Sequence, residues 1–208
     1  MRKVLVANAK GGCGKTTVAI TIAASLAAMG QDVILADADR QRSALAWAAM
    51  RPGKRSRVLA VDWSKEKAIG AYPKGRDMLV IDGPGGLRSK LAEQLVAESE
   101  HIVVPVMPSA FDWRATEDFI KRISKLKPIR KGKAGIYIVA NRTRPNTKLQ
   151  CDFNLFLEGL GLPVVAYISD RVVYSQLAAS GETVFDRSGR EATDMQAQWH
   201  ALVERLRD

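Results

Sequence analysis

A glycine-rich octapeptide near the amino terminus constrains the fold more than any other feature of this chain. Residues 10–17 read Lys-Gly-Gly-Cys-Gly-Lys-Thr-Thr, after the apolar run Val4–Asn8 and before a helical pattern over Thr16–Met29. Glycine adopts backbone dihedrals that a Cβ forbids, so consecutive N–H groups can curl around an anion, and the helix that follows adds its positive end. A strand, a glycine loop and a helix in this order predict a loop that binds phosphate groups.

Each residue of the octapeptide has a predicted role in binding a nucleotide. We expect the Lys15 ammonium to reach the β- and γ-phosphates and the Thr16 hydroxyl to hold Mg²⁺. A small side chain is all that the loop requires of Cys13. The expected nucleotide-binding residues of the loop are Gly11, Gly12, Cys13, Gly14, Lys15, Thr16 and Thr17.

The octapeptide differs from the pattern G-x-x-x-x-G-K-[ST], because residue 9 is Ala and an additional lysine, Lys10, precedes the glycines. It resembles, at all eight positions, the deviant Walker A motif K-G-G-x-G-K-T-T of the ParA/MinD group of P-loop ATPases. The resemblance implies that ATP is the nucleotide and that the chain forms a homodimer on ATP binding. It also implies that Lys10 crosses the dimer interface to the partner's phosphates, so that Lys10 and Lys15 are both catalytic.

Apolar, Val/Ile-rich runs alternate with helical patterns along the whole chain, and this alternation predicts a parallel sheet covered on both faces. Together with the resemblance it predicts an α/β fold of the P-loop NTPase type. We expect a three-layer sandwich, with a mostly parallel, twisted sheet of seven or eight strands and helices on both faces, in a single domain spanning residues 1–208. The expected strands are Lys3–Asn8, Val33–Asp37, Arg57–Val61, Met78–Asp82, His101–Met107, Ala134–Asn141 and Pro163–Ile168. The expected helices are Thr16–Met29, Arg42–Met50, Leu87–Glu98, Arg114–Lys127, Leu149–Leu160, Val172–Ser180 and Ala192–Leu206.

Two aspartates stand at the end of the second expected strand, and their spacing of two places both on one side of it. Hydrolysis of a phosphate needs a group that orients the attacking water, and Asp39 is the candidate for this role, with Asp37 supporting the metal. The segment resembles the family's D-x-D-P-Q, with Arg40 where the family usually has Pro. The alternative is that these aspartates cap the helix that follows.

The fourth expected strand ends at Asp82 after four apolar residues, and it resembles a Walker B element. Asp82 would hold Mg²⁺ through its water shell, because this ion keeps several of its waters in proteins. The turn that follows, residues 83–86, is rich in Gly and Pro and could respond to the γ-phosphate as switch segments do. A simple turn after a strand is the alternative.

The ends of the last two expected strands are predicted to enclose the base. The resemblance implies that Asn141 faces the adenine, which it can meet as donor and acceptor, and that Arg142 stacks on it. Ser169 and Asp170 would form the other side of this pocket. A further segment, residues 105–112, resembles the P-V-x-P-S-x-x-D of plasmid-partition ATPases, where it lies near the subunit interface. A strand that simply ends between prolines is the alternative.

The net charge of +10 is concentrated in one block. From Phe119 to Cys151 there are no Asp or Glu, and the Lys and Arg residues are Lys121, Arg122, Lys125, Lys127, Arg130, Lys131, Lys133, Arg142, Arg144 and Lys148. Such a block favours binding to nucleic acid through phosphate contacts, whereas a solvated face and an anionic membrane are the alternatives. The family also has DNA-contacting basic residues near the C-terminus, where this chain has Arg187, Arg190, Arg205 and Arg207, and the sequence does not rank the two clusters.

The resemblance to short ParA-type ATPases covers nearly the whole chain and implies a function. It predicts slow ATP hydrolysis stimulated by a ParB-like or cargo adaptor protein, non-specific DNA binding, and the partition or positioning of a plasmid, chromosome region or protein cargo. Two cysteines, no apolar run of membrane-spanning length and no leader segment favour a cytoplasmic protein, with no membrane expected. The resemblance implies that it is also nucleoid-associated. The alternatives are a MinD-like membrane-associated role, through the apolar stripe near the C-terminus, and a nucleotide-driven filament.

Overall fold

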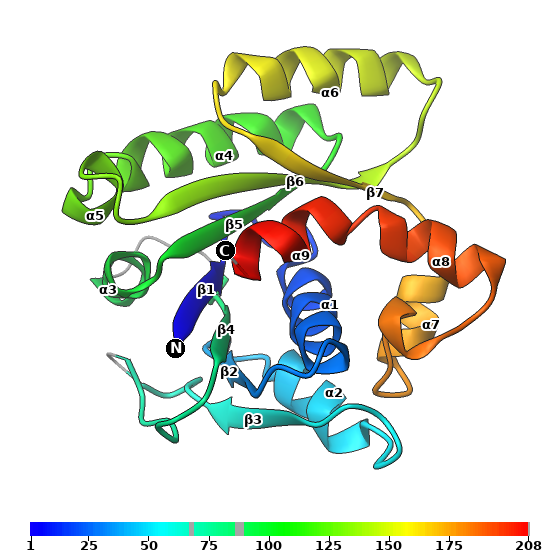
Figure 1. Ribbon diagram of the computed structural model, residues 1–208. Helices are drawn as coiled ribbons and strands as arrows, with labels where there is room; N and C mark the ends of the chain where they lie inside the picture. The colour runs from blue at the N-terminus through cyan, green and yellow to red at the C-terminus, as the bar shows by residue number, and fades with distance from the viewer. Residues whose placement is uncertain (67–68, 86–89, 208) are drawn as a thin grey trace.

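Seven parallel strands lie at the centre of the computed structural model, which describes residues 1–66, 69–85 and 90–207 (Figure 1). The strand order across the sheet is β3-β2-β4-β1-β5-β6-β7. Every strand pair in the described residues is parallel. The strands are β1 Arg2–Val6, β2 Val33–Asp37, β3 Val58–Asp62, β4 Met78–Asp82, β5 His101–Val106, β6 Gly135–Thr143 and β7 Val164–Ser169.

Helices cover both faces of the sheet, which confirms the predicted α/β sandwich (Figure 1). One face carries α1 Lys15–Ala28, α2 Ser43–Met50, α7 Val173–Ala178, a 3₁₀ turn Val184–Asp186, α8 Arg190–Ala197 and α9 His200–Arg207. The other face carries α3 Lys90–Glu98, α4 Ala110–Ile123, α5 Lys127–Arg130 and α6 Lys148–Gly159.

Alternation along the strands builds the two hydrophobic cores. Val4 and Val6 of β1 face the core under α1, whereas Leu5 and Ala7 face the core under α3, α4 and α6. Successive strand residues point to opposite faces, so a strand covered on both sides must be apolar throughout. The near-continuous apolar runs in the sequence follow from this burial.

The carboxyl edge of the sheet gathers the residues that carry chemistry. β1 lies between β4 and β5, and the glycine loop leaves the end of β1 and enters α1. In the registers of neighbouring strands, Asp82 is paired with Val6 on one side and with Asp37 on the other. In open α/β sheets ligands bind beyond the carboxyl ends of the strands, where connections diverge to the two sides, and β1 occupies that place here.

Four of the seven expected helices agree with the structure to within two residues at each end, and the other three differ further. The helix expected over Arg114–Lys127 starts earlier and ends at Ile123, and a separate turn, α5, follows. Pro128 has no N–H to donate, so it suits the first turn of a new helix and not the interior of a longer one. The expected helix Leu87–Glu98 is described only from Lys90, because residues 87–89 lie outside the described part of the chain.

The helix expected over Ala192–Leu206 is divided into α8 and α9 by a turn at Gln198 and Trp199. The Gln198 side chain accepts a hydrogen bond from the Ser169 N–H at 2.9 Å. The Trp199 indole N–H donates to the Tyr174 hydroxyl at 3.2 Å, and the ring is almost fully buried. These anchors fix the turn against β7 and α7, and sequence periodicity does not reveal them.

The apolar stripe of this C-terminal segment is part of the core. Met195, Trp199, Leu202, Val203 and Leu206 are all buried, in the cluster that includes α1. The stripe on which the MinD-like alternative depends is therefore packed in the core. In the described part of the chain, no helix has both the length and the apolar composition that crossing a bilayer demands.

Candidate nucleotide-binding site

The glycine loop has the backbone conformation that its composition predicts. Gly12 and Gly14 have φ angles of +77° and +89°, which only glycine adopts readily. Gly14 is also confined from outside, since a Cβ there would lie 2.3 Å from the Asn141 side-chain nitrogen. That nitrogen donates to the Cys13 carbonyl at 2.9 Å, so Asn141 braces the loop from the end of β6.

Asn8 anchors the start of the loop, and the sequence analysis did not identify it as a site residue. Its amide nitrogen donates to the Pro105 carbonyl at 2.8 Å and to the Thr116 hydroxyl at 3.0 Å. Its amide oxygen accepts from the Lys10 N–H at 3.3 Å. This buried side chain therefore ties the loop to β5 and α4. A polar residue that directly follows an apolar strand was the only signal in the sequence.

The two lysines of the loop are held in different ways. The Lys15 ammonium donates to the Lys10 carbonyl at 2.9 Å and is largely buried inside the loop. The Lys10 ammonium forms an ion pair with Asp112 at 2.9 Å, and 42% of its side chain is exposed. Lys15 therefore lies within the loop's concavity, whereas Lys10 lies at its rim, held by the first turn of α4.

Thr16 and Asp82 form a pair that suits a hydrated magnesium ion. The Thr16 hydroxyl donates to Asp82 Oδ2 at 2.7 Å, while Asp82 Oδ1 is buried with no hydrogen-bond partner among the described residues. Burial raises the pKa of Asp82 to about 7, against the opposing effect of the Thr16 hydroxyl. A buried, unpartnered carboxylate oxygen beside a hydroxyl fits an ion that binds through waters and phosphates.

No cluster of three or more His, Cys, Asp or Glu side chains in the described residues could hold a metal ion without other ligands. Mg²⁺ usually binds through one or two carboxylates together with waters and substrate phosphates. The chemistry of the Thr16–Asp82 pair agrees with that mode of binding.

Asp37 caps α2 from the end of β2. Its two carboxylate oxygens accept hydrogen bonds of 3.0 Å from the Asp39 and Leu45 N–H groups. Burial raises the pKa of Asp37, and these N–H groups partly oppose the increase. The capping role that the sequence left open is therefore present, and a further contribution of Asp37 to a metal site stays a prediction.

Asp39 links two loops that border the site. Its Oδ1 accepts from the Gln41 N–H at 2.9 Å and its Oδ2 accepts from the Gly85 N–H at 2.7 Å. The carboxylate thus connects the loop after β2 to the loop after β4. Residues 86–89 of the second loop lie outside the described part of the chain, including Gly86 of the expected switch turn.

A cleft of about 1370 Å³ opens over the glycine loop. Its lining includes Gly11, Gly12, Gly14, Lys15, Thr16 and Thr17 from the loop and helix, Asp39 and Arg40 after β2, Gly85 after β4, and Arg142 near the end of β6. The structure therefore places the predicted catalytic carboxylate and the phosphate-binding loop in one cleft.

A smaller hollow of about 400 Å³ shares Arg142 with this cleft. It is lined by Met107, Pro108, Arg142, Arg144, Thr147, Leu149, Gln150 and Asp170. Arg144, which the sequence analysis did not select as a site residue, donates to Asp170 Oδ2 at 2.8 Å. The position of this hollow beside the larger cleft suits the base of a nucleotide. The contacts of Asn141, Arg142, Ser169 and Asp170 with adenine stay predictions.

Residues 4–184 match the CobQ/CobB/MinD/ParA nucleotide binding domain, which is most of the chain. The chain belongs to this family. The predicted resemblance to the ParA/MinD group is thereby confirmed, and the octapeptide lies within the matched residues.

Two relatives of this chain have names that describe the distribution or partitioning of a cellular structure. Maintenance of carboxysome distribution protein A from Halothiobacillus neapolitanus is 32% identical over 212 residues, covering 91% of this chain and 90% of the relative. Chromosome-partitioning ATPase Soj from Thermus thermophilus is 29% identical over 163 residues, covering 64% of each protein. Among solved structures, the ATP complex of Cyanothece McdA(D38A) matches with a TM-score of 0.77 at 14% identity, covering 97% of this chain and 96% of that chain. This last likeness shows the shared fold.

Proposed function

We propose that this protein is an ATPase that dimerises on ATP binding, binds DNA without sequence preference, and partitions or positions a plasmid, a chromosome region or a protein cargo. The observation that carries the proposal is the single cleft that contains the glycine loop, Asp39 and Lys15, beside the Thr16–Asp82 pair. The names of the relatives support a positioning role, since one maintains carboxysome distribution and another partitions chromosomes.

The residues of the cleft have separate tasks in this proposal. The N–H groups of the glycine loop and the Lys15 ammonium bind the phosphates of ATP and neutralise their charge. The Thr16 hydroxyl and Asp82 would hold Mg²⁺, which supplies charge neutralisation on the β- and γ-phosphates when bound. Asp39 orients the attacking water and accepts its hydrogen bond.

The present contacts of Asp39 support slow hydrolysis by the protein alone. Both carboxylate oxygens are engaged by the N–H groups of Gln41 and Gly85. Each oxygen can still accept from a water, but the two N–H groups fix the direction of the carboxylate, so a shift of either loop would re-aim it toward the γ-phosphate. A ParB-like or cargo adaptor protein that shifts either loop would therefore stimulate turnover.

Dimerisation gives Lys10 its role. Its ion pair with Asp112 lies at the rim of the loop and leaves the ammonium partly exposed. Exchange of this contact for the triphosphate of a second subunit would make ATP a bridge between two chains. In this proposal the ATP-bound dimer associates with the nucleoid in the cytoplasm, and the monomer is released after hydrolysis.

A membrane-tethered role has less support than DNA binding. The apolar stripe that would enter a bilayer is buried in the core by α1 and the sheet. DNA binding instead draws on the basic residues of the 119–151 block, of which several are exposed. Vesicle binding by the C-terminal helix would require unpacking of that core.

The test is ATP hydrolysis by the full chain with Mg²⁺, measured as phosphate release, for the wild-type protein and Asp39→Ala. We expect slow turnover in the wild type and at least a hundredfold less in the variant, while binding of a fluorescent ATP analogue is retained. Equal turnover in the two proteins would contradict the assignment of Asp39. Failure of the wild type to bind ATP would contradict the proposed function itself.

A further inference from the structure

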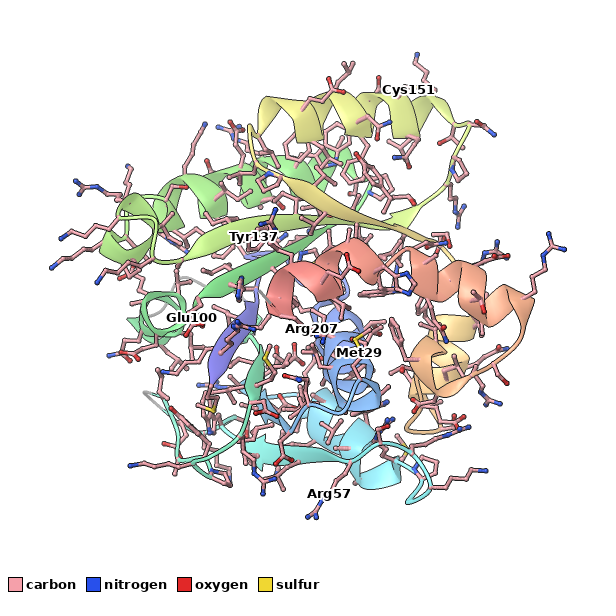
Figure 2. All side chains as sticks on the ribbon, viewed as in Figure 1. Met29, Arg57, Glu100, Tyr137, Cys151 and Arg207 are labelled. Carbon is pink, nitrogen blue, oxygen red and sulfur yellow. The ribbon has the colours of Figure 1, made fainter. Side chains whose placement is uncertain are left out.

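The segment that joins α4 to β6 carries a dense group of cations. Lys125, Lys127, Arg130, Lys131 and Lys133 lie within nine residues and are all exposed. None of them takes part in the ion pairs found among the described residues, in contrast to Lys121, which pairs with Glu117 at 2.6 Å. Figure 2 shows side chains with nitrogen tips projecting into solvent around α5. These charges are therefore free to meet an external anion.

The fold places this group at the amino edge of the sheet. β6 begins at Gly135, which is paired with His101, the first residue of β5. The α4–β6 segment ends just before this point, so it lies at the edge opposite to the glycine loop, which follows the carboxyl end of β1. A partner bound here leaves the nucleotide cleft open.

Part of the C-terminal basic cluster reaches the same edge from the other face of the sheet. The Arg205 guanidinium lies over the ring of Tyr137, the third residue of β6, at 5.9 Å from its centroid. Arg207, the last residue of α9, is exposed and is labelled in Figure 2. Burial lowers the pKa of His101, and the nearby charges of Arg2 and Arg205 add to this decrease against the opposing effect of Glu100.

The other two C-terminal arginines lie elsewhere. Arg187 pairs with the buried Glu182 at 2.6 Å, and Arg190 begins α8, which lies far from α5 in Figure 1. The structure thus splits the C-terminal cluster, and only Arg205 and Arg207 lie at the same edge as the α4–β6 segment. We call Lys125, Lys127, Arg130, Lys131, Lys133, Arg205 and Arg207 the amino-edge basic face.

We propose that the amino-edge basic face binds the phosphate backbone of duplex DNA. The inference rests on the DNA binding in the proposed function and assigns its location. Flexible, exposed Lys and Arg side chains neutralise phosphates and release counterions without reading bases. Two acidic residues precede β5 at this edge: Glu98 pairs with Lys3 at 3.2 Å, and Glu100 is exposed beside His101.

The same face is poorly suited to a membrane. Leu126 and Ile129, the large apolar residues between the cations, pack against the core under α3, α4 and α6. Stable attachment to a bilayer usually needs inserted apolar side chains in addition to basic ones. DNA requires only the charges, so it is the partner that the composition of this face favours.

The experiment compares duplex DNA binding by full-length proteins with ATP and Mg²⁺ across roughly 50–200 mM salt. The test variant is Lys127→Ala/Arg130→Ala/Lys131→Ala, and Arg205→Ala/Arg207→Ala probes the other side of the face. The control is Lys54→Ala/Arg57→Ala/Lys74→Ala, which removes three charges from exposed residues outside this face. Arg57 directly precedes β3, at the other end of the strand order (Figure 2). Retained binding of a fluorescent ATP analogue shows that each variant is folded.

The plot of the logarithm of the DNA association constant against the logarithm of salt concentration has a negative slope. In the two face variants we expect this slope to become less steep by about 0.9 for each phosphate that the variant no longer neutralises. The control variant should keep the wild-type slope. A control variant that binds DNA as weakly as the face variants would overturn the location and leave the proposed function intact. Absence of DNA binding by the wild type, with or without binding to vesicles of phosphatidylserine and phosphatidylcholine, would overturn both.

Discussion

At the scale of single residues, the site is organised around carboxylates that burial has made weaker acids. Asp82 and Asp37 are neighbours in register at the ends of β4 and β2, and both are fully buried. Burial raises the pKa of each, and the charge of Asp37 adds to the increase at Asp82. A cation at this point would relieve that cost, which explains why such side chains suit a metal-binding edge and would be unfavourable in an ordinary core.

Asp82→Asn should stabilise the metal-free protein at pH 8 more than at pH 5. The pKa of Asp82 is raised from its ordinary 3.8 to about 7, so between these values the folded state holds a proton that the unfolded state lacks. The wild type therefore loses stability as pH rises through this window, and the amide variant avoids the loss. Thermal unfolding at several pH values with a chelator measures the difference. A difference that is independent of pH would contradict the assignment.

Lys15→Ala should weaken ATP binding by roughly 10- to 100-fold, because hydrogen bonds from a charged group contribute about 1.5–3 kcal/mol. Titration with a fluorescent ATP analogue measures the affinity. Lys54→Ala is a suitable control, since this lysine is exposed and does not line the cleft. Unchanged affinity in Lys15→Ala would mean that the phosphates bind elsewhere.

At the scale of elements, the glycine loop depends on contacts as well as on its own backbone. Two independent constraints require glycine at position 14: its φ angle is positive, and the Asn141 side chain occupies the space that a Cβ would need. Gly161 has a positive φ of +62° with open space around the missing Cβ, so it isolates the effect of the backbone.

We expect Gly161→Ala to cost about 1–2 kcal/mol of stability, which is the usual cost of a left-handed non-glycine residue, and to leave ATP binding unchanged. Gly14→Ala should cost more and should abolish ATP binding, since Asn141 must move and release the Cys13 carbonyl. Chemical denaturation and nucleotide titration measure the two effects. Equal effects of the two substitutions would show that the Asn141 brace is unimportant.

The sequence predicted the helices, strands and loops whose conformation depends on the local pattern of residues. All seven strands follow from apolar runs, and the glycine loop follows from its motif. The division of the last helix does not, because it depends on the contact of Gln198 with β7 and on the burial of Trp199. Asn8 and Arg144 were missed for the same reason: their importance comes from partners more than 20 residues away, Thr116 and Asp170.

At the scale of the whole molecule, the sheet separates the two proposed binding sites. The nucleotide cleft lies at the carboxyl edge, and the amino-edge basic face lies at the opposite edge of the same strands. Dimerisation through the cleft would place the two basic faces at opposite ends of one particle, so ATP would increase affinity for DNA that is long or dense enough to reach both faces. ATP-dependent DNA binding is then a consequence of dimer formation.

The most direct measurement of the central claim is the mass of the full-length protein in solution with ATP and Mg²⁺, by size-exclusion chromatography with light scattering. Asp39→Ala, which retains ATP, should have the mass of two chains, and Asp39→Ala/Lys10→Ala should have the mass of one. A dimer that persists without the Lys10 ammonium, or an Asp39→Ala protein that stays monomeric with ATP bound, would contradict the account.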